Sequence, residues 1–234
     1  MGPVTRRSLC LLVAGAVLLA ACGGGREALG PPVAAVGPRS VYVAIGSDEE
    51  LGEGSANALQ SSWPQVFFRR TLPGNTVFVN AAAHDATVEA ALDVQLPIAR
   101  QQRPTIVSVV LGAQEELAGD PRPQFTDQLT KLLRSLRAID KTRVLVGSAV
   151  ALPSLAPDVR TARKAAYDAA IAKAAAATGA EVVPLGDITA TGDQQVGTNG
   201  RPDPAFPIDD HESEAVAAAF SKAFGKRSTP TSAR

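Results

Sequence analysis

The chain has 234 residues, with 23 basic and 23 acidic side chains, so its formal net charge is zero. No basic field is present to suggest nucleic acid or an anionic lipid surface as a partner. The length, less a short leader, fits one domain with a substantial hydrophobic core.

The first 21 residues are typical of an export signal. Arg6 and Arg7 form a positive start, residues 9–19 a short apolar core, and LAAC (19–22) a small-residue cleavage site ending in Cys22. The apolar run is shorter than the about 20 residues that a membrane span requires. LAAC resembles the lipobox of bacterial lipoproteins, which implies that Cys22 carries lipid and anchors an exported protein to a membrane of the cell envelope. An ordinary secretory signal is the alternative.

The mature chain divides into three parts. Residues 22–39 hold the lipidated Cys22 and a tether rich in Gly and Pro. Residues 40–225 form the domain, and residues 226–234 a frayed tail. Cys10 leaves with the signal, so the exported domain has no cysteine for a disulfide and depends on its core for stability.

Short β-rich apolar runs alternate along the domain with longer segments of helical character. The runs are Val41–Ile45, Thr76–Val79, Thr105–Leu111, Arg143–Ala149 and Glu181–Pro184. This alternation predicts an α/β fold, a three-layer α/β/α sandwich around a five-stranded parallel sheet. In such sheets the ligand cleft lies beyond the carboxyl ends of the strands.

Three helices are predicted with defined faces or ends. Residues 125–139 place apolar side chains on one face; these are Phe125, Leu129, Leu132, Leu133 and Leu136. Residues 160–179 form an Ala-rich helix closed by Gly179, which suits a left-handed C-cap. The last helix, about 212–224, follows a loop rich in Pro and Asp.

Four segments at the expected cleft carry short motifs: YVAIGSDEELGEG (42–54), VNAAAHDAT (79–87), VVLGAQEEL (109–117) and DPAFPIDDH (203–211). Together they resemble the conserved blocks of SGNH (GDSL-type) hydrolases, which are esterases and lipases with a flavodoxin-like fold. The resemblance runs from about residue 40 to 224. It implies a Ser nucleophile activated by His, an Asp that orients the His, and Gly and Asn donors that form an oxyanion hole.

The nucleophile block is altered. Its Gly46 and Gly52 match the family pattern without a gap, and this register places Asp48 at the position of the family's Ser. Ser47 stands one residue earlier and, with Glu50, reads S-x-x-E, which predicts a capping box at a helix start. Ser47 is therefore either a helix cap or a displaced nucleophile.

The oxyanion blocks are also altered. Asp85 replaces the family's Gly, and Gln114 replaces the Asn, whereas Gly112 is kept. A carboxylate about 4 Å from a developing oxyanion would repel it by about 4 kcal/mol at an effective dielectric constant near 20. His84 lies beside this block and is a further candidate.

In the simplest alignment, the fourth block has no histidine at the position of the family's catalytic base. Asp203 matches the family's Asp, but the catalytic His position falls on Phe206. Aligning His211 there instead requires a deletion of several residues. His211 is either a shifted base or an exposed, ion-paired residue at a helix start.

Three functions remain open. The preferred hypothesis is a membrane-anchored SGNH-like pseudoenzyme with a binding or cell-envelope role; the second is an active ester hydrolase that uses Ser47 and His211. The third is an acidic cleft that binds a cation or a sugar. An ester or glycan ligand fits these hypotheses, and neither a cofactor nor a set of metal ligands is assigned. The acidic side chains expected near the cleft are Asp48, Glu49, Asp85, Glu115, Glu116, Asp203, Asp209 and Asp210.

Overall fold

The computed structural model describes residues 40–53, 55, 57–119, 122–152, 155–186, 188 and 210–226. Within these residues a five-stranded parallel sheet has the strand order β2-β1-β3-β4-β5. The strands are β1 (Val41–Gly46), β2 (Val77–Asn80), β3 (Ile106–Val110), β4 (Arg143–Gly147) and β5 (Glu181–Val183). All five strand predictions are confirmed, and the sheet is of the flavodoxin-like type that the resemblance implied.

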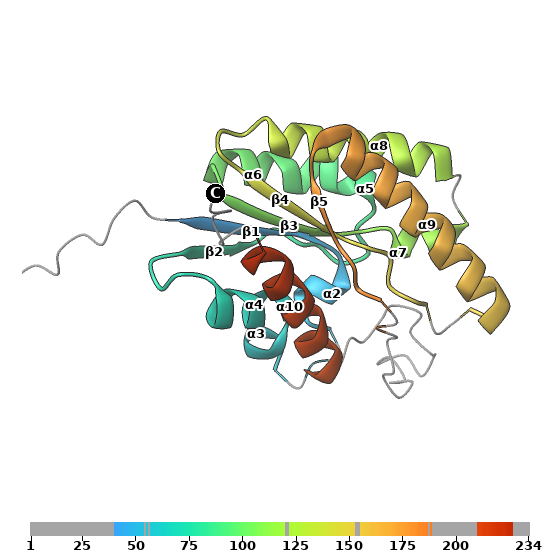
Figure 1. The fold of residues 1–234 in the computed structure, drawn as a ribbon, viewed down its shortest axis with the longest axis horizontal. Helices are drawn as coiled ribbons and strands as arrows, with labels where there is room; N and C mark the ends of the chain where they lie inside the picture. The colour runs from blue at the N-terminus through green and yellow to red at the C-terminus, as the bar shows by residue number, and fades with distance from the viewer. Residues whose placement is uncertain are drawn as a thin grey trace, which may run out of the picture. The chain divides into compact units, whose positions relative to one another are not determined.

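Helices cover both faces of the sheet (Figure 1). One layer contains α5 (Val88–Ala90), the π-helical segment η1 (Ala91–Gln95), α6 (Leu96–Gln102), α8 (Arg122–Arg137) and α9 (Pro157–Thr178). The other contains α2 (Asp48–Leu51), α3 (Ala58–Ser61), α4 (Trp63–Thr71) and α10 (Asp210–Gly225). The short helix α7 (Ala113–Ala118) follows β3. Right-handed crossovers between parallel strands place helices on both faces in this way.

Each face of the sheet has its own hydrophobic core. On the α8 side, the five apolar side chains predicted to share one face of that helix are all buried against the sheet, which confirms the prediction. On the α10 side, Trp63 stacks on Phe220 with ring centroids 4.4 Å apart. The helix α9 ends at Gly179 with a φ of 72°, the predicted left-handed C-cap.

Several predictions fall outside the described residues. These are the signal, the tether with Cys22, the tail from residue 227, and the loop residues Asp203, Phe206 and Asp209. Among the helices that the structure describes, none has the length and apolar character needed to cross a membrane.

A buried glutamine fixes the end of strand β1, which lies between β2 and β3. The Gln95 side chain accepts a hydrogen bond from the Gly46 N–H at 3.0 Å and donates one to the Gly46 carbonyl at 2.9 Å. The pairing of β1 with β2 ends at Ala44, and beyond it the Gly46 carbonyl also accepts the Ala83 N–H at 3.3 Å, whereas Gln95 supplies the acceptor for the Gly46 N–H. This clamp positions the backbone from which the next residues, Ser47 and Asp48, project.

We expect Gln95→Ala to lower the free energy of unfolding by about 1 to 3 kcal/mol, because the buried Gly46 N–H loses its acceptor. Urea denaturation measures this change. Gln101→Ala, on the exposed side of the same helical segment, is the matched control and should change stability by less than about 0.5 kcal/mol. Equal effects of the two substitutions would contradict the proposed clamp.

Candidate functional site

The site begins where β1 ends and α2 begins. Gly46 leaves room there for the Glu50 carboxyl, because an added Cβ would lie 2.0 Å from that carboxyl in its present position. The capping box predicted for Ser47 and Glu50 is present, and the Glu50 carboxyl accepts the Ser47 N–H at 3.0 Å. The turn into α2 is therefore held by its own side chains.

The hydroxyl of Ser47 is buried and forms two hydrogen bonds. It accepts a hydrogen bond from the Ala86 N–H at 3.0 Å and donates one to Asp48 Oδ2 at 3.1 Å. Among the hydrogen bonds of the described residues, none joins Ser47 to an imidazole. Within the described part of the chain, the Ser47 hydroxyl thus donates to the Asp48 carboxylate and not to the imidazole that activates a serine nucleophile.

The carboxylate of Asp48 is the centre of the site. It is almost completely buried, and it accepts the backbone N–H of Asp85 at 3.2 Å and the side-chain amide of Gln114 at 3.2 Å. These two residues occupy the positions that the family resemblance gives to the oxyanion hole. Their donors thus point at a carboxylate of the protein itself.

Asp85 adopts a backbone conformation that favours glycine. Its φ is 51°, in the left-handed region that favours Gly, and this turns its N–H toward Asp48. Its side chain is 62% exposed and accepts a hydrogen bond from Gln114 at 3.1 Å. The carboxylate that lies among the expected oxyanion donors is therefore the one of Asp48. The sequence suggested instead that the carboxylate of Asp85 would lie there.

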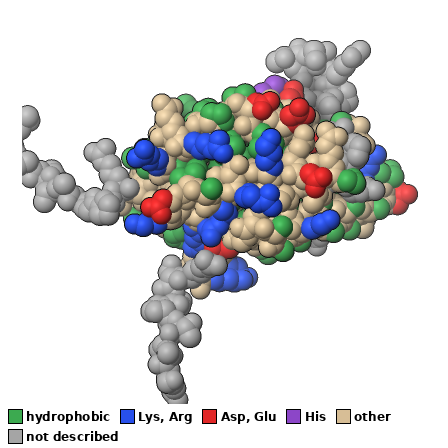
Figure 2. All heavy atoms as spheres, turned by 90° about the horizontal axis from the view of Figure 1, so that it is seen from above, with side chains coloured by type: hydrophobic (Ala, Val, Ile, Leu, Met, Phe, Trp, Pro, Cys, Tyr) green, Lys and Arg blue, Asp and Glu red, His purple; other side chains and the backbone are tan. Residues whose placement is uncertain are grey.

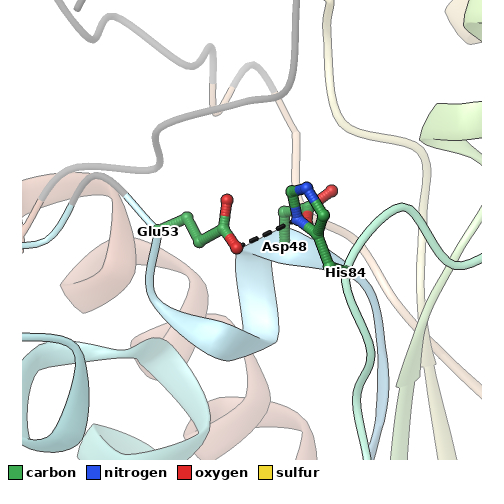
Figure 3. A group of neighbouring side chains, drawn as sticks. All are labelled: Asp48, Glu53 and His84. Carbon is green, nitrogen blue, oxygen red and sulfur yellow. Dashed lines mark hydrogen bonds and ion pairs between the residues drawn. The ribbon is translucent and has the colours of Figure 1, made fainter. Parts of the chain in front are cut away.

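His84 joins Asp48 to a further acid, Glu53, in the turn after α2 (Figure 3). Its Nδ1 lies 2.5 Å from Asp48 Oδ1 and 3.0 Å from Glu53 Oε1, and its Nε2 lies 3.4 Å from Asp85 Oδ2. The pKa of His84 is raised, chiefly by its hydrogen bond to Asp48. The imidazole therefore keeps its positive charge to a higher pH than an ordinary histidine.

Buried glutamates surround this group. Burial raises the pKa of Glu49 to about 7 and that of Glu50 well above its ordinary value. Glu116, on α7, is also buried, and desolvation raises its pKa to about 7. Glu115 accepts the Val88 N–H at 2.6 Å. Of the expected acidic cluster, the members on α2 and α7 are thus buried rather than solvated on loops.

A small cavity of about 10 Å³ lies beside Ser47. Glu49 and Glu116 contribute to its wall, together with Gly112, whose φ is 121° and whose Cα faces the ring of Phe125. Such a cavity has room for about one water molecule.

The remaining predicted residues lie apart or outside the described residues. His211 is exposed on the first turn of α10, beside the exposed Asp210. Asp203, the catalytic candidate of the fourth block, and Phe206, at the family's His position, lie outside the described residues. The structure brings Ser47, Asp48, Asp85 and Gln114 together as the motif spacing suggested.

Glu53 is the residue that the sequence did not single out. It follows the motif Gly52 and reaches His84, which comes from the segment after β2. The contact between Glu53 and His84 could not be predicted from a motif, because the two residues belong to different segments. They meet because β1 and β2 are neighbours in the sheet.

The comparisons with known proteins agree with this fold. The sequence profile of the GDSL-like lipase/acylhydrolase family matches residues 34–214. The chain therefore belongs to this family. No curated protein matches the sequence.

Solved structures show the same fold at low identity. The structure of TesA aligns at 18% identity with a TM-score of 0.59, over 79% of this chain and 99% of that one. The esterase EstA from Pseudoalteromonas sp. aligns at 16% identity with a TM-score of 0.60, over 80% and 98%. A catalytic mutant of the acetylxylan esterase Axe2 from Geobacillus stearothermophilus aligns at 16% identity with a TM-score of 0.60, over 81% and 96%.

The buried Glu116 makes stability depend on pH. Its folded-state pKa of about 7 lies above the unfolded value, so the folded state loses stability as pH rises from about 4.5 to about 7. Asp168 adds to this effect, and Arg163 and Lys164 oppose it. We expect Glu116→Gln to be about 2 kcal/mol more stable than the wild type near pH 8.

Urea denaturation at about pH 4 and about pH 8 measures this difference, which should vanish at the lower pH because both states are then protonated. Glu89→Gln, an exposed substitution, is the control and should show no such pH dependence. An equal gain for Glu116→Gln at both pH values would show that charge burial is not the cause.

Proposed function

We propose that this protein is a lipid-anchored member of the GDSL-like family whose ester-hydrolysing site is closed by Asp48, and that it acts in binding or in cell-envelope upkeep. The observation that carries the proposal is the hydrogen bonding of Asp85 N–H and Gln114 to the buried Asp48 carboxylate. These two N–H donors, which would stabilise the oxyanion of a reaction intermediate, already bond to Asp48.

The energetic argument concerns charge. A tetrahedral intermediate at this position would place its oxyanion beside the Asp48 carboxylate, with a repulsion of about 4 kcal/mol at 4 Å and a dielectric constant near 20. Losing one oxyanion donor already costs about 3 kcal/mol of transition-state stabilisation. The two effects together correspond to a rate loss of about five orders of magnitude.

The nucleophile and the base are also disfavoured. Ser47 is buried, and its hydroxyl donates a hydrogen bond to Asp48. His211 is exposed on α10. His84, the imidazole at the site, contacts Asp48. Hydrolysis through Ser47 and His211 would therefore need a rearrangement of both residues.

The membrane anchor rests on the sequence alone, through the lipobox-like LAAC before the tether. In this proposal the domain is exported, and the tether holds it at the surface of a bacterial membrane. A neutral overall charge is consistent with anchoring by lipid rather than by electrostatic attraction to headgroups.

The esterase test uses short-chain nitrophenyl esters and a fluorophosphonate probe on the purified protein. We expect no turnover above the Ser47→Ala background and no labelling of Ser47, because its hydroxyl is buried and donates to Asp48. The esterase EstA, which has a similar fold, serves as the positive control.

Turnover that is abolished by both Ser47→Ala and His211→Ala would overturn the proposal and establish the alternative, an active hydrolase. Turnover that depends on neither residue would point to a contaminating esterase, and repeat purification would remove it.

The anchor test is detergent-phase partitioning of the protein expressed with its leader in a bacterium that processes lipoproteins. We expect the wild type in the detergent phase and Cys22→Ser in the aqueous phase, because only Cys22 can take the lipid. Cys10→Ser, in the leader, is the matched control and should partition as the wild type does. Wild-type protein in the aqueous phase would instead favour an ordinary secretory signal.

A further inference from the structure

The cleft contains one group of side chains with the chemistry of a metal site. Asp48, Glu53 and His84 each offer a ligand atom, and the three atoms lie within 4.8 Å of one another. They come from the start of α2, the turn after it and the segment following β2, and they converge on one point (Figure 3). The set is one imidazole nitrogen and two carboxylate oxygens.

Two carboxylate oxygens converge on one nitrogen of His84. Asp48 Oδ1 and Glu53 Oε1 lie 2.5 and 3.0 Å from the same atom, Nδ1. That nitrogen carries at most one proton, so it donates a hydrogen bond to one of the two oxygens at a time. A cation placed between the three atoms would be bound by all three at once.

The charge balance is a separate observation. The Asp48 carboxylate is almost completely buried, and Asp85 places another acid 3.4 Å from the imidazole. The group therefore holds two carboxylates, those of Asp48 and Glu53, for one imidazole. Figure 2 shows a histidine beside acidic side chains at one margin of the face that it displays. A group with more carboxylates than basic side chains is costly to hold together, and a metal ion is a common counter-charge.

The orientation of Asp48 suits a ligand. Its Oδ2 is held by Ser47 Oγ at 3.1 Å and by Gln114 Nε2 at 3.2 Å, and its Oδ1 faces the imidazole. Ligating carboxylates and imidazoles are commonly oriented by such outer hydrogen bonds. The exposed fractions of Glu53 and His84, 41% and 58%, leave the group open to solvent.

We propose that Asp48, Glu53 and His84 bind a divalent first-row transition metal ion, with Zn²⁺ as the reference ion. Three protein ligands of type N, O and O leave an open position in a tetrahedral site. Imidazole disfavours Ca²⁺ and Mg²⁺, which prefer oxygen ligands. Ligand atoms of a tetrahedral zinc site lie about 3.3 Å apart. The imidazole nitrogen, 2.5 and 3.0 Å from the two oxygens, would therefore separate from each by less than about 1 Å. The two oxygens, which lie within 4.8 Å of each other, would approach by at most about 1.5 Å. This inference rests on the proposed function, because it assigns a ligand to the cleft that Asp48 closes to esters.

The test is isothermal titration of the metal-free, EDTA-treated protein with ZnCl₂, together with thermal unfolding at each concentration. We expect one ion per chain and a melting temperature that rises with Zn²⁺. His84→Ala and Glu53→Gln should each weaken binding by about 100-fold or more, since loss of even an outer-shell partner costs 10- to 100-fold. Both side chains are substantially exposed, so both variants should fold, which circular dichroism verifies.

The chain supplies matched controls. His211 is the other of its two histidines, and His211→Ala should leave Zn²⁺ binding unchanged, as should Glu89→Gln. Substitution by Co²⁺ gives an independent readout, because a tetrahedral site develops visible absorption that His84→Ala should abolish. Absence of binding, binding that survives both ligand substitutions, or binding of Ca²⁺ in preference to Zn²⁺ would each overturn the proposal.

The outcomes remain distinguishable from those of the ester assay. Zinc binding is measured without any substrate, and the ester assay is run on the metal-free protein. Ester turnover through Ser47 with normal zinc binding would overturn only the proposed function. Failure of zinc binding with no turnover would overturn only the metal site.

Discussion

The carboxylate of Asp48 is the interaction on which the rest of the site depends. It stands just beyond the carboxyl end of strand β1, at the position to which the family resemblance assigns the nucleophile. Its four partners come from three segments: the Ser47 hydroxyl, the His84 ring and Asp85 N–H, and the Gln114 amide. A serine hydroxyl at this position would leave the donors available to a substrate. A carboxylate accepts their hydrogen bonds and excludes a second negative charge.

The surroundings of Asp48 support the proposal that this site does not stabilise an oxyanion. Glu49 and Glu50 are buried on the same short helix, and burial raises the pKa of both carboxyls. Each is therefore harder to ionise than an exposed carboxyl. The Asp48 charge is met by His84, whose pKa it raises. Among the described residues, the site combines acids with the imidazole of His84.

Much of the fold could be predicted from local patterns. The β-rich runs, the apolar face of α8 and the C-cap at Gly179 are all found where the sequence placed them. These features depend on neighbouring residues and on the alternation of strands and helices. The clamp of Gln95 on Gly46 was not predicted, because it joins residues 49 positions apart through a side chain in η1. A buried amide gives no periodic signal of its own.

The sequence by itself determined the family blocks, the register that puts Asp48 at the nucleophile position, and the capping box of Ser47 and Glu50. Those features follow from spacing within short segments. Only the tertiary structure decided that Asp48, rather than Asp85, carries the charge among the oxyanion donors. It also decided that His84 and Glu53 meet there. The reason is physical: parallel strands β1 and β2 place distant segments side by side, and the left-handed backbone at Asp85 directs its N–H inward and its carboxylate outward.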